Sequence, residues 1–418
     1  MLVDLQYGRQ GLRLSLPDHC VVLKPRKAAP VPDERAAIRH ALRSPTDSLP
    51  LARLAGKGMR VVVTHSDITR ATPNDRLLPV ILAELETCGV HREDITLLNA
   101  LGTHRPQTAH ELGRMLGKQV FDNYRCIQHN AFDDQALVAV GKTSFGNDIR
   151  LNRTLLEADL KIFTGFIEPH FFAGFSGGPK AVLPALAGAE SVFSNHSYAM
   201  IGHPGATFGL NSGNPIWEEM AEAAQKVPNT FLVNVTLDSE HRITGVYAGE
   251  VIAAHAAGCQ AVRDASHVKI DAPFDIAITT NSGYPLDQNL YQCVKGLAAA
   301  RRAVRKGGTI LLLAGCEDGL PANSAYIDLL RRAGSPQELL RMVAQPGFRE
   351  QDAWQVQVQA QIQQDVEVHV FSAGLSDREI RDALMIPCHD IQATLQDLLS
   401  RFGERVCVLP EGPMVIVE

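Results

Sequence analysis

The chain has 418 residues, of which 45% are hydrophobic and 21% are charged, and its net charge is −6. This composition is that of a globular protein and excludes a fibrous or wholly disordered chain. The slight acidic excess argues against nucleic acid as a partner, because there is no overall positive field to attract phosphates. No stretch approaches the roughly 20 consecutive apolar residues of a membrane span, and the first residues lack the layout of a signal peptide, so we expect a cytoplasmic protein with no membrane partner.

Short runs rich in β-branched residues alternate with amphipathic segments along the chain. The runs predict strands at residues 60–64, 95–100, 160–164, 231–236, 275–280, 309–313, 366–371 and 405–409. Apolar residues that recur every three or four positions predict helices at 76–88, 107–116 and 290–306. This alternation is typical of parallel sheets covered by helices, so we predict an α/β fold with mostly parallel, Rossmann-like sheets.

A domain boundary is predicted near residue 270. The segment from His267 to Pro273 is polar and contains a proline just before a new strand, as linkers between domains do. We therefore expect an N-terminal α/β domain of residues 1–270 and a C-terminal α/β domain of residues 271–418, with the extreme C-terminus free to pack back on the first domain. Ligands of such folds bind beyond the carboxyl ends of the strands, so the loops that follow the strands are the candidate sites.

The most distinctive loop, residues 169–180, contains three glycines and ends in Lys180. Closely spaced glycines before a lysine suggest a phosphate-binding loop. However, Pro179 stands where a Walker motif requires glycine, and Ala181 stands where it requires Ser or Thr. Two interpretations stay open for Lys180: a nucleophile activated by apolar surroundings, or a surface lysine after a turn.

Three histidines lie beside glycine or proline turns or a short polar run rather than on helical faces. They are His104, His170 and His196, and each is either a proton-transfer group or a structural turn histidine. The sequence contains no His-Glu-x-x-His motif, and its eight cysteines show no zinc-site spacing.

Candidate ligand-binding side chains occur in two further segments. Arg70 could pair with a carboxylate through two parallel hydrogen bonds, and Asp67 could accept hydrogen bonds from ribose hydroxyls. Gln292 and Lys295 lie three positions apart and therefore share one helical face. Asp67 and Arg70 could equally be a cap and a solvated side chain, and a pair such as Gln292 and Lys295 is usually part of a solvated helical face.

Together these motifs resemble those of the lactate racemase family. The match consists of Asp67-x-Thr69-Arg70, Gly102-Thr103-His104, Pro169-His170 with Gly174-x-Ser176-Gly177-Gly178-x-Lys180, Asn195-His196 and Gln292-x-x-Lys295, in family order. The motifs span about residues 60–300, and the length of the chain extends the resemblance to the whole protein.

The resemblance implies a cofactor, a substrate class and a role for each residue. The cofactor is a nickel-pincer nucleotide, in which nickel is held by a pyridinium-3,5-bisthiocarboxylic acid mononucleotide attached covalently to Lys180. The implied roles are His196 as nickel ligand, His104 and His170 as acid and base, Arg70, Gln292 and Lys295 as ligands of a 2-hydroxy carboxylate, and Asp67, Ile68, Thr69 and Arg70 as cofactor contacts. The site is expected in the cleft between the two domains, and the proteins that build the cofactor are expected to be transient partners.

The chemistry of a 2-hydroxy acid agrees with this set of residues. Removing a proton beside a carboxylate places negative charge next to negative charge, whereas removing a hydride avoids this problem. A histidine that takes the hydroxyl proton while hydride leaves gives a planar keto acid, and hydride returned to the other face inverts the centre. One histidine then acts as acid or base at each face of the keto acid, and cationic side chains orient the carboxylate.

Two features depart from what the family leads us to expect. Ala71 follows Arg70 where proline is expected, and this position shapes the loop. Phe171 and Phe172 beside His170, with Phe175 nearby, are bulkier than a pocket for a methyl group requires. We therefore hypothesise a substrate with a larger or aromatic side chain, with sugar acids also within the range of the family.

Two other functions remain as alternatives. A 2-hydroxy acid dehydrogenase would release a keto acid, but the first half of the chain has no Gly-x-Gly-x-x-Gly after a strand. A noncatalytic binding protein for a carboxylate or a nucleotide would use Lys180 only as a phosphate contact. A test for racemisation of a pure enantiomer distinguishes the racemase hypothesis from both alternatives, because neither the dehydrogenase nor the binding protein would convert one enantiomer into the other.

Overall fold

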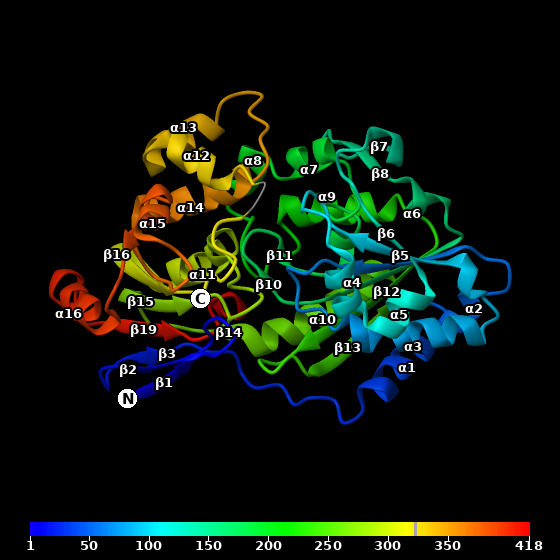
Figure 1. Ribbon diagram of the computed structural model, residues 1–418, viewed down its shortest axis with the longest axis horizontal. Helices are drawn as coiled ribbons and strands as arrows, with labels where there is room; N and C mark the ends of the chain where they lie inside the picture. The colour runs from blue at the N-terminus through cyan, green and yellow to red at the C-terminus, as the bar shows by residue number, and fades with distance from the viewer. Residues whose placement is uncertain (322–323) are drawn as a thin grey trace.

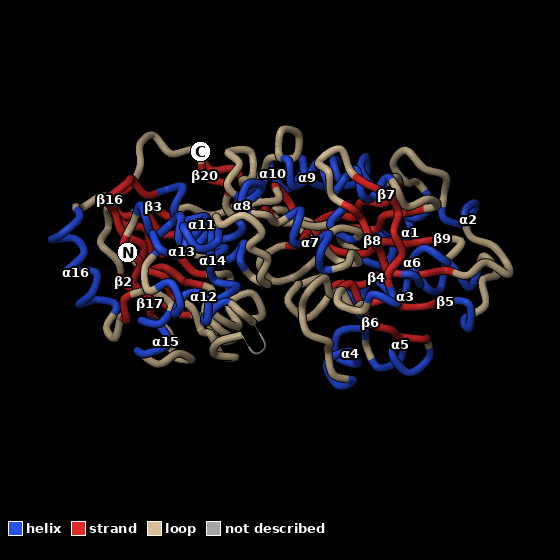
Figure 2. The backbone as a smooth tube through the Cα atoms, turned by 90° about the horizontal axis from the view of Figure 1, so that it is seen from above, coloured by secondary structure: helices blue, strands red, loops and turns tan. Residues whose placement is uncertain are grey.

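The computed structural model describes residues 1–321 and 324–418. Two lobes lie side by side, and each is built on a six-stranded sheet (Figure 1). Seen from above, the strands of the two sheets form separate groups (Figure 2). This architecture confirms the predicted α/β class with mostly parallel sheets.

The first sheet has the strand order β13-β12-β9-β4-β5-β6, and only the β12–β13 pair is antiparallel. Its strands are Ile243–Gly249 (β13), Thr230–Leu237 (β12), Leu160–Phe166 (β9), Val61–Ser66 (β4), Ile95–Ala100 (β5) and Arg125–Gln128 (β6). Every residue of β9 is buried, as expected for a central parallel strand with both faces covered. The chain leaves β4 toward β5 on one side, whereas β9 lies on the other side, so the loops after β4 and β9 diverge at a topological switch point.

The second sheet has the strand order β18-β17-β16-β15-β19-β3, and all its pairs are parallel. Its strands are Ile386–Pro387 (β18), Glu367–Phe371 (β17), Val304–Leu313 (β16), Phe274–Thr280 (β15), Val406–Leu409 (β19) and Val21–Val22 (β3). The helix predicted at 290–306 ends three residues early, at Ala303, because Val304 begins β16.

The predicted N-terminal domain of residues 1–270 differs from the structure at its start. The hairpin of β1 (Leu2–Leu5) and β2 (Leu12–Ser15), together with β3, lies with the second sheet, beside β19 in Figure 1. Val3, Leu5 and Leu14 are buried against apolar residues of that sheet. The reason is hydrophobic burial: sequence position alone does not show which sheet these apolar side chains will cover. At the other end of the chain, Ile416–Val417 (β20) pairs with His267–Val268 (β14) at the boundary.

Helices cover both sheets and fill the connections. In the first lobe they are Glu34–Arg43 (α1), Leu51–Leu54 (α2), Asn74–Thr87 (α3), Ala109–Leu116 (α4), Lys118–Asn123 (α5), Arg153–Glu157 (α6), Ala189–Asn195 (α7), Tyr198–Ile201 (α8), Pro215–Gln225 (α9) and Val251–Ser266 (α10). In the second lobe they are Leu290–Ala303 (α11), Tyr326–Ala333 (α12), Pro336–Val343 (α13), Ala353–Asp365 (α14), Asp377–Asp382 (α15) and Ile391–Phe402 (α16). Shorter elements are the hairpins β7–β8 (Leu137–Lys142, Asp148–Asn152) and β10–β11 (Pro169–His170, Gly174–Phe175), and the 3-10 turns Arg92–Asp94 (η1), Asp134–Ala136 (η2), Gly178–Ala181 (η3) and Gly412–Met414 (η4).

Polar contacts from the start of α14 tie the two lobes together near the cleft. Gln351 donates to the Thr103 carbonyl at 3.1 Å, and Gln357 donates to the Tyr198 carbonyl at 2.9 Å. Among the described residues, no helix is both long and apolar enough to cross a membrane.

Candidate active site

A cavity lies between the lobes, beyond the carboxyl ends of β4, β5 and β9 and beside the first turns of α11. Of the side chains predicted from the sequence to form a site, those that line it are Asp67, Arg70, His104, His170, Lys180, His196, Gln292 and Lys295. Ile68 and Thr69 do not line this cavity. The fold therefore gathers residues that are more than 200 positions apart in the sequence.

The loop after β4 presents Asp67 and Arg70 to the cavity. Thr69 supports this loop, because its hydroxyl donates to Asp67 Oδ1 at 2.7 Å and its backbone N–H donates to the same oxygen at 3.1 Å. Arg70 Nη1 is buried and has no hydrogen-bond partner among residues 1–321 and 324–418, so its donors are available to an acceptor in the cavity. Ala71 does not line the cavity, and its side chain packs against the apolar core of the first lobe.

The loop after β5 carries His104. The His104 N–H donates to the Leu101 carbonyl at 3.0 Å and closes a turn, in which Gly102 takes a positive φ of 56°. His104 Nδ1 makes a short hydrogen bond to Asp67 Oδ2. The side chain of His104 is 31% exposed, whereas that of Asp67 is 4% exposed, so the histidine lies between a buried carboxylate and the open part of the cavity.

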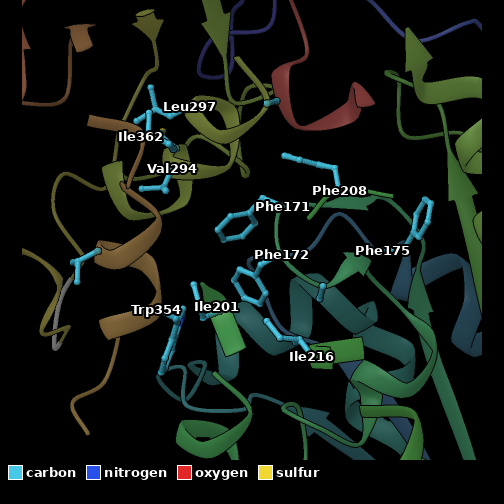
Figure 3. Close-up of a cluster of buried hydrophobic side chains, with 14 of the residues drawn as sticks. Phe171, Phe172, Phe175, Ile201, Phe208, Ile216, Val294, Leu297, Trp354 and Ile362 are labelled. Atoms are coloured by element: carbon cyan, nitrogen blue, oxygen red, sulfur yellow. The ribbon is translucent and has the colours of Figure 1, made fainter. Parts of the chain in front are cut away.

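The β10–β11 hairpin after β9 holds His170 in an aromatic setting. The His170 ring lies 4.9 Å from the Phe171 ring and 4.6 Å from the Phe172 ring. Phe171 and Phe172 belong to the same buried cluster as Trp354 and Val294 from the second lobe (Figure 3). Burial lowers the pKa of His170 well below its usual value, and the nearby charges of Lys180, Lys295 and Arg70 lower it further, so the ring is neutral at physiological pH.

A tight glycine turn places Lys180 at the cavity. Gly177 and Gly178 have positive φ angles of 77° and 54°, and a Cβ on Gly178 would lie 2.3 Å from His255 Cγ, so this position requires glycine. The Gly178 N–H donates to Asn234 Oδ1 at 2.8 Å. Because that amide is already occupied, the turn does not form the open amide cradle of a Walker loop.

The Lys180 amine forms no hydrogen bond or ion pair with any residue that the structure describes, although its Nζ lies 5.6 Å from the centre of the Phe172 ring. Burial lowers the pKa of Lys180 well below its usual value, and the charges of Arg70 and Lys295 lower it further. An uncharged amine is a nucleophile, so the surroundings favour covalent chemistry at Lys180.

His196 follows the last residue of α7 and is 6% exposed. Its ring packs edge-on against Phe172 at 5.1 Å and Trp354 at 5.2 Å. Burial, followed by the charge of Lys180, lowers its pKa to about 3. His196 Nδ1 is buried and has no hydrogen-bond partner within the described part of the chain, which leaves a neutral imidazole free to bind a metal.

The second lobe contributes the first turns of α11. Asn289 caps this helix by accepting a hydrogen bond from the Gln292 N–H at 3.1 Å. Lys295 Nζ donates to Gln292 Oε1 at 2.7 Å, as their spacing on one helical face predicts. Burial, followed by the charge of Arg70, lowers the pKa of Lys295 to about 7.

Sequence reasoning assigned no role to two residues that line this cavity, Tyr291 and Trp354, or to Glu168, which lies beside it. Tyr291 and Trp354 line the cavity, and Trp354 Nε1 donates to the Tyr291 hydroxyl at 3.2 Å. Glu168 is 5% exposed; burial raises its pKa, and the charges of Lys295, Arg70 and Lys180 oppose that rise. Sequence position could have indicated two of these residues as site candidates, because Glu168 lies in the loop after β9 and Tyr291 precedes Gln292. Nothing near Trp354 in the sequence points to the cavity.

The described residues contain no group of three or more His, Cys, Asp or Glu side chains placed to hold a metal ion. A metal at this site would therefore have His196 as a protein ligand and would need further donors from a bound group. The unpartnered Nδ1 of His196 and the free amine of Lys180, both at the same cavity, fit a metal-containing group that is attached to the lysine.

The fold and the cavity define a two-domain α/β protein whose interdomain cavity is lined by basic and imidazole side chains. The model of the lactate racemase N-terminal domain matches residues 7–209, and the model of the C-terminal domain matches residues 269–417. The chain belongs to the lactate racemase family and is an isomerase of the racemase class.

Two curated relatives and one solved structure agree with this assignment, and a second solved structure shares the fold. The chain is 32% identical to a lactate racemase of Thermoanaerobacterium thermosaccharolyticum over 99% of both chains. It is 37% identical to a lactate racemase of Lactiplantibacillus plantarum over 92% of this chain and 91% of that protein. The structure of the Thermoanaerobacterium lactate racemase apoprotein superposes with a TM-score of 0.92 over the whole of both chains, at 32% identity. A Thermotoga maritima protein shares the fold at a TM-score of 0.73 and 21% identity, over 92% of this chain and 98% of its own.

Proposed function

We propose that this protein racemises or epimerises a 2-hydroxy acid by reversible hydride transfer. The observation that carries the proposal is the shared cavity, in which two cations and two histidines from separate loops and a helix lie together. The cations are Arg70 and Lys295, and the histidines are His104 and His170. Cations can bind and orient the carboxylate of a 2-hydroxy acid, and histidines can accept and donate the proton of its hydroxyl group.

Arg70, Gln292 and Lys295 bind the substrate. The unpartnered Nη1 of Arg70 donates to the carboxylate, and the Lys295 ammonium adds a second positive charge. Gln292 holds Lys295 through its Oε1 and keeps its own amide N–H groups for a substrate oxygen. Held in this way, the carboxylate keeps its place while the carbon beside it changes configuration.

His104 and His170 act at the hydroxyl group. Each lines the cavity and has one ring nitrogen engaged by the protein, Nδ1 in both cases. Nε2 is therefore the nitrogen available to a substrate oxygen. A histidine that takes the hydroxyl proton permits the carbon-bound hydrogen to leave with its electron pair.

Lys180 and His196 hold the cofactor, which is a nickel-pincer nucleotide bound covalently at Lys180 with His196 as the protein ligand of nickel. The buried amine of Lys180, whose pKa lies well below its usual value, and the unpartnered Nδ1 of His196 support these roles. The loop of Asp67, Ile68, Thr69 and Arg70 contributes further cofactor contacts, and separate maturation proteins supply the cofactor. When bound, this group would supply reversible hydride transfer at the substrate carbon.

The substrate is lactate or a 2-hydroxy acid with a larger side chain. Phe171, Phe172 and Trp354 form an apolar wall of the cavity, and such a wall favours an apolar substituent. Phe172 also packs against the rings of His170 and His196, so part of its bulk orients these histidines.

The test uses protein produced in cells that supply the maturation proteins. Pure enantiomers of lactate, phenyllactate and malate are added separately, and the enantiomer ratio is followed by chiral chromatography together with release of any keto acid. We expect racemisation of at least one acid without net keto acid release. Intact mass and metal analysis on the same sample should show a mononucleotide-sized adduct on Lys180 and about one nickel per chain.

Three outcomes would overturn parts of the proposal. Keto acid release would favour a dehydrogenase, and an unchanged enantiomer in protein that carries the adduct would favour a binding protein. A clear preference for lactate over phenyllactate would remove the larger side chain from the proposal and leave the racemase assignment in place.

A further inference from the structure

A second cavity lies on the other side of the loops after β4 and β9 from the candidate active site. It encloses about 270 Å³, whereas the candidate active site encloses about 140 Å³. Phe166 lines both cavities, and the loop after β4 presents Arg70 to the first and Ala71 to the second. The second cavity lies beyond the carboxyl ends of β9 and β12, where ligands of α/β sheets bind. None of the residues proposed to bind the substrate or the cofactor, or to transfer a proton, lines it.

The segment between β3 and α1 forms part of the wall of this cavity. In Figure 1 it is the blue chain that runs from the second lobe to α1 in the first lobe. The Arg26 N–H holds the segment in place by donating to the Ala265 carbonyl at the end of α10, at 2.7 Å. Lys24, Arg26 and Lys27 line the cavity and are exposed. Within residues 1–321 and 324–418, their side chains form no ion pair, so all three positive charges are available to a ligand.

Most of the other charged groups of the lining already have partners. Asp238 and Glu240 form ion pairs with Arg242 at 2.7 Å and 3.3 Å. Burial lowers the pKa of His241, so this ring is neutral at physiological pH. The carboxylate of Glu168 lies near the cations of the candidate active site. These groups therefore leave few charges for a ligand of the second cavity.

Glu411 is different, because its carboxylate forms no hydrogen bond or ion pair with any residue that the structure describes. Burial raises the pKa of Glu411, the charge of Asp238 raises it further, and the charges of Lys24 and Lys27 oppose the rise. The two lysines are thus close enough to act on Glu411 but lie beyond the 4.0 Å of an ion pair. Opposite charges face this cavity with a gap between them.

A ligand that fits this gap carries a cationic group and an anionic group close together. A partly buried carboxylate without a donor gains most from a ligand, because water already solvates the exposed cations. Glu411 would repel a simple anion, and Lys24 and Lys27 would repel a simple cation. Apolar side chains such as Ile167 and Met414 also line the cavity. At about 30 Å³ for each water-sized group, the cavity holds roughly nine non-hydrogen atoms, which is the size of leucine or methionine.

We propose that the second cavity binds a free amino acid with an apolar side chain. The ammonium group of the ligand pairs with Glu411, its carboxylate pairs with Lys24 and Lys27, and its side chain lies against the apolar part of the lining. This site goes beyond the proposed racemase function and does not depend on it, because protein without cofactor is sufficient to measure binding.

The first experiment is calorimetric titration of the full-length protein with leucine and with methionine. Isocaproate and isoamylamine serve as probes, because they keep the side chain of leucine but lack its ammonium group and its carboxylate, respectively. We expect leucine or methionine to bind, and each probe to bind roughly tenfold more weakly or worse, since each loses a hydrogen bond between charged groups. Absence of binding by both amino acids, or equal binding of leucine and either probe, would overturn the inference.

Variants of the lining test the two ends of the ligand. Glu411→Gln keeps the size of the side chain and removes its charge, so leucine affinity should fall roughly tenfold. Lys24→Gln combined with Lys27→Gln changes only exposed residues and should lower the affinity roughly fivefold. The control is Lys57→Gln, an exposed lysine that lines neither cavity, and it should leave the affinity unchanged. Wild-type affinity in both the Glu411 variant and the double lysine variant would refute the proposed site.

A last comparison separates the second cavity from the candidate active site, where Arg70 and Lys295 would also attract a carboxylate. Leucine affinity should be unchanged in Lys295→Gln. Photo-leucine, a diazirine analogue that inserts into nearby bonds on irradiation, should label peptides from residues 24–28 or 261–266, and excess leucine should prevent the labelling. Affinity that is lost in Lys295→Gln but kept in Glu411→Gln, or a label confined to α11, would place leucine in the candidate active site and overturn the inference. Failure of racemisation would leave this binding result standing and would refute only the proposed function.

Discussion

The two halves of the cavity hold their functional side chains in different ways. The first lobe uses separate loops after β4, β5 and β9, a hairpin and a glycine turn. The Asp67–His104 contact ties two of the loops to each other, and the Gly178–Asn234 hydrogen bond ties the glycine turn to β12. The second lobe uses one face of α11 for Gln292 and Lys295. Groups that react must meet a substrate atom closely and from several directions, which a single helix cannot provide. We therefore expect substitutions in the first lobe to abolish catalysis and substitutions in the second lobe to weaken substrate binding.

The largest effect is expected from Lys180→Ala, because this change removes the amine that we propose as the anchor of the cofactor. Racemisation should fall to background, and intact mass should show no adduct. Lys118→Ala is the control, because its side chain is 88% exposed and does not line the cavity. An adduct of unchanged mass in Lys180→Ala would show that the attachment lies elsewhere.

His104→Ala and His170→Ala should each lower kcat by roughly 10²–10⁴-fold, because each removes both proton transfer and hydrogen bonding at the substrate oxygen. Initial rates from each pure enantiomer measure the effect. The exposed His40 on α1 offers a control, and His40→Ala should behave like the wild type. Near-normal turnover in either cavity variant would contradict a role for that histidine.

His196→Ala should weaken nickel retention at least tenfold while leaving the covalent adduct on Lys180 in place. The two readouts separate metal binding from attachment, since mass spectrometry reports the organic adduct and metal analysis reports nickel. If the nickel content stays at the wild-type level, His196 is not a ligand of the metal.

If Lys295 binds the substrate as proposed, substrate binding will depend on pH. Its pKa of about 7 means that the ammonium is present below this pH and is lost as pH rises through it. KM for the 2-hydroxy carboxylate should rise roughly tenfold as pH increases above 7, since a hydrogen bond to a charged group contributes about 1.5–3 kcal/mol. Lys295→Arg should abolish this rise because guanidinium stays charged, and a KM that is flat with pH in the wild type would contradict the assignment.

The smallest effect is expected from Glu168→Gln. The Glu168 carboxylate favours the charged form of Lys295, so its removal should lower the pKa of Lys295 and move the KM increase to lower pH. The value of kcat with saturating substrate should change less than KM. Glu93→Gln alters an exposed carboxylate in the turn before β5, at the end of that strand opposite the cavity, and should leave the dependence of KM on pH unchanged. A shift to higher pH would show that Glu168 does not act on Lys295 in this way.

The local pattern of apolar residues was sufficient to predict most of the central strands. The strand predicted at 95–100 has those bounds in the structure, because a run of buried apolar residues between polar turns leaves little choice of conformation. The edge strands β6 and β13 were not predicted, since their residues are only partly buried and lack a strong apolar pattern. β3 is only two residues long, and its pairing with β19 joins segments almost 400 positions apart.

The amino-acid sequence by itself determined the α/β alternation, the placement of polar loops after strands, and the spacing that puts Gln292 and Lys295 on one helical face. These properties depend on neighbours within a few positions along the chain. Only the tertiary structure decided that Asp67 would meet His104, that Trp354 would reach His196, and that Glu168 would lie near three cations. The proton states of His104, His170 and Lys295 depend on such through-space contacts and on burial, because both the energy of a charge and the tautomer of a ring respond to the atoms around them rather than to adjacent residues in the chain.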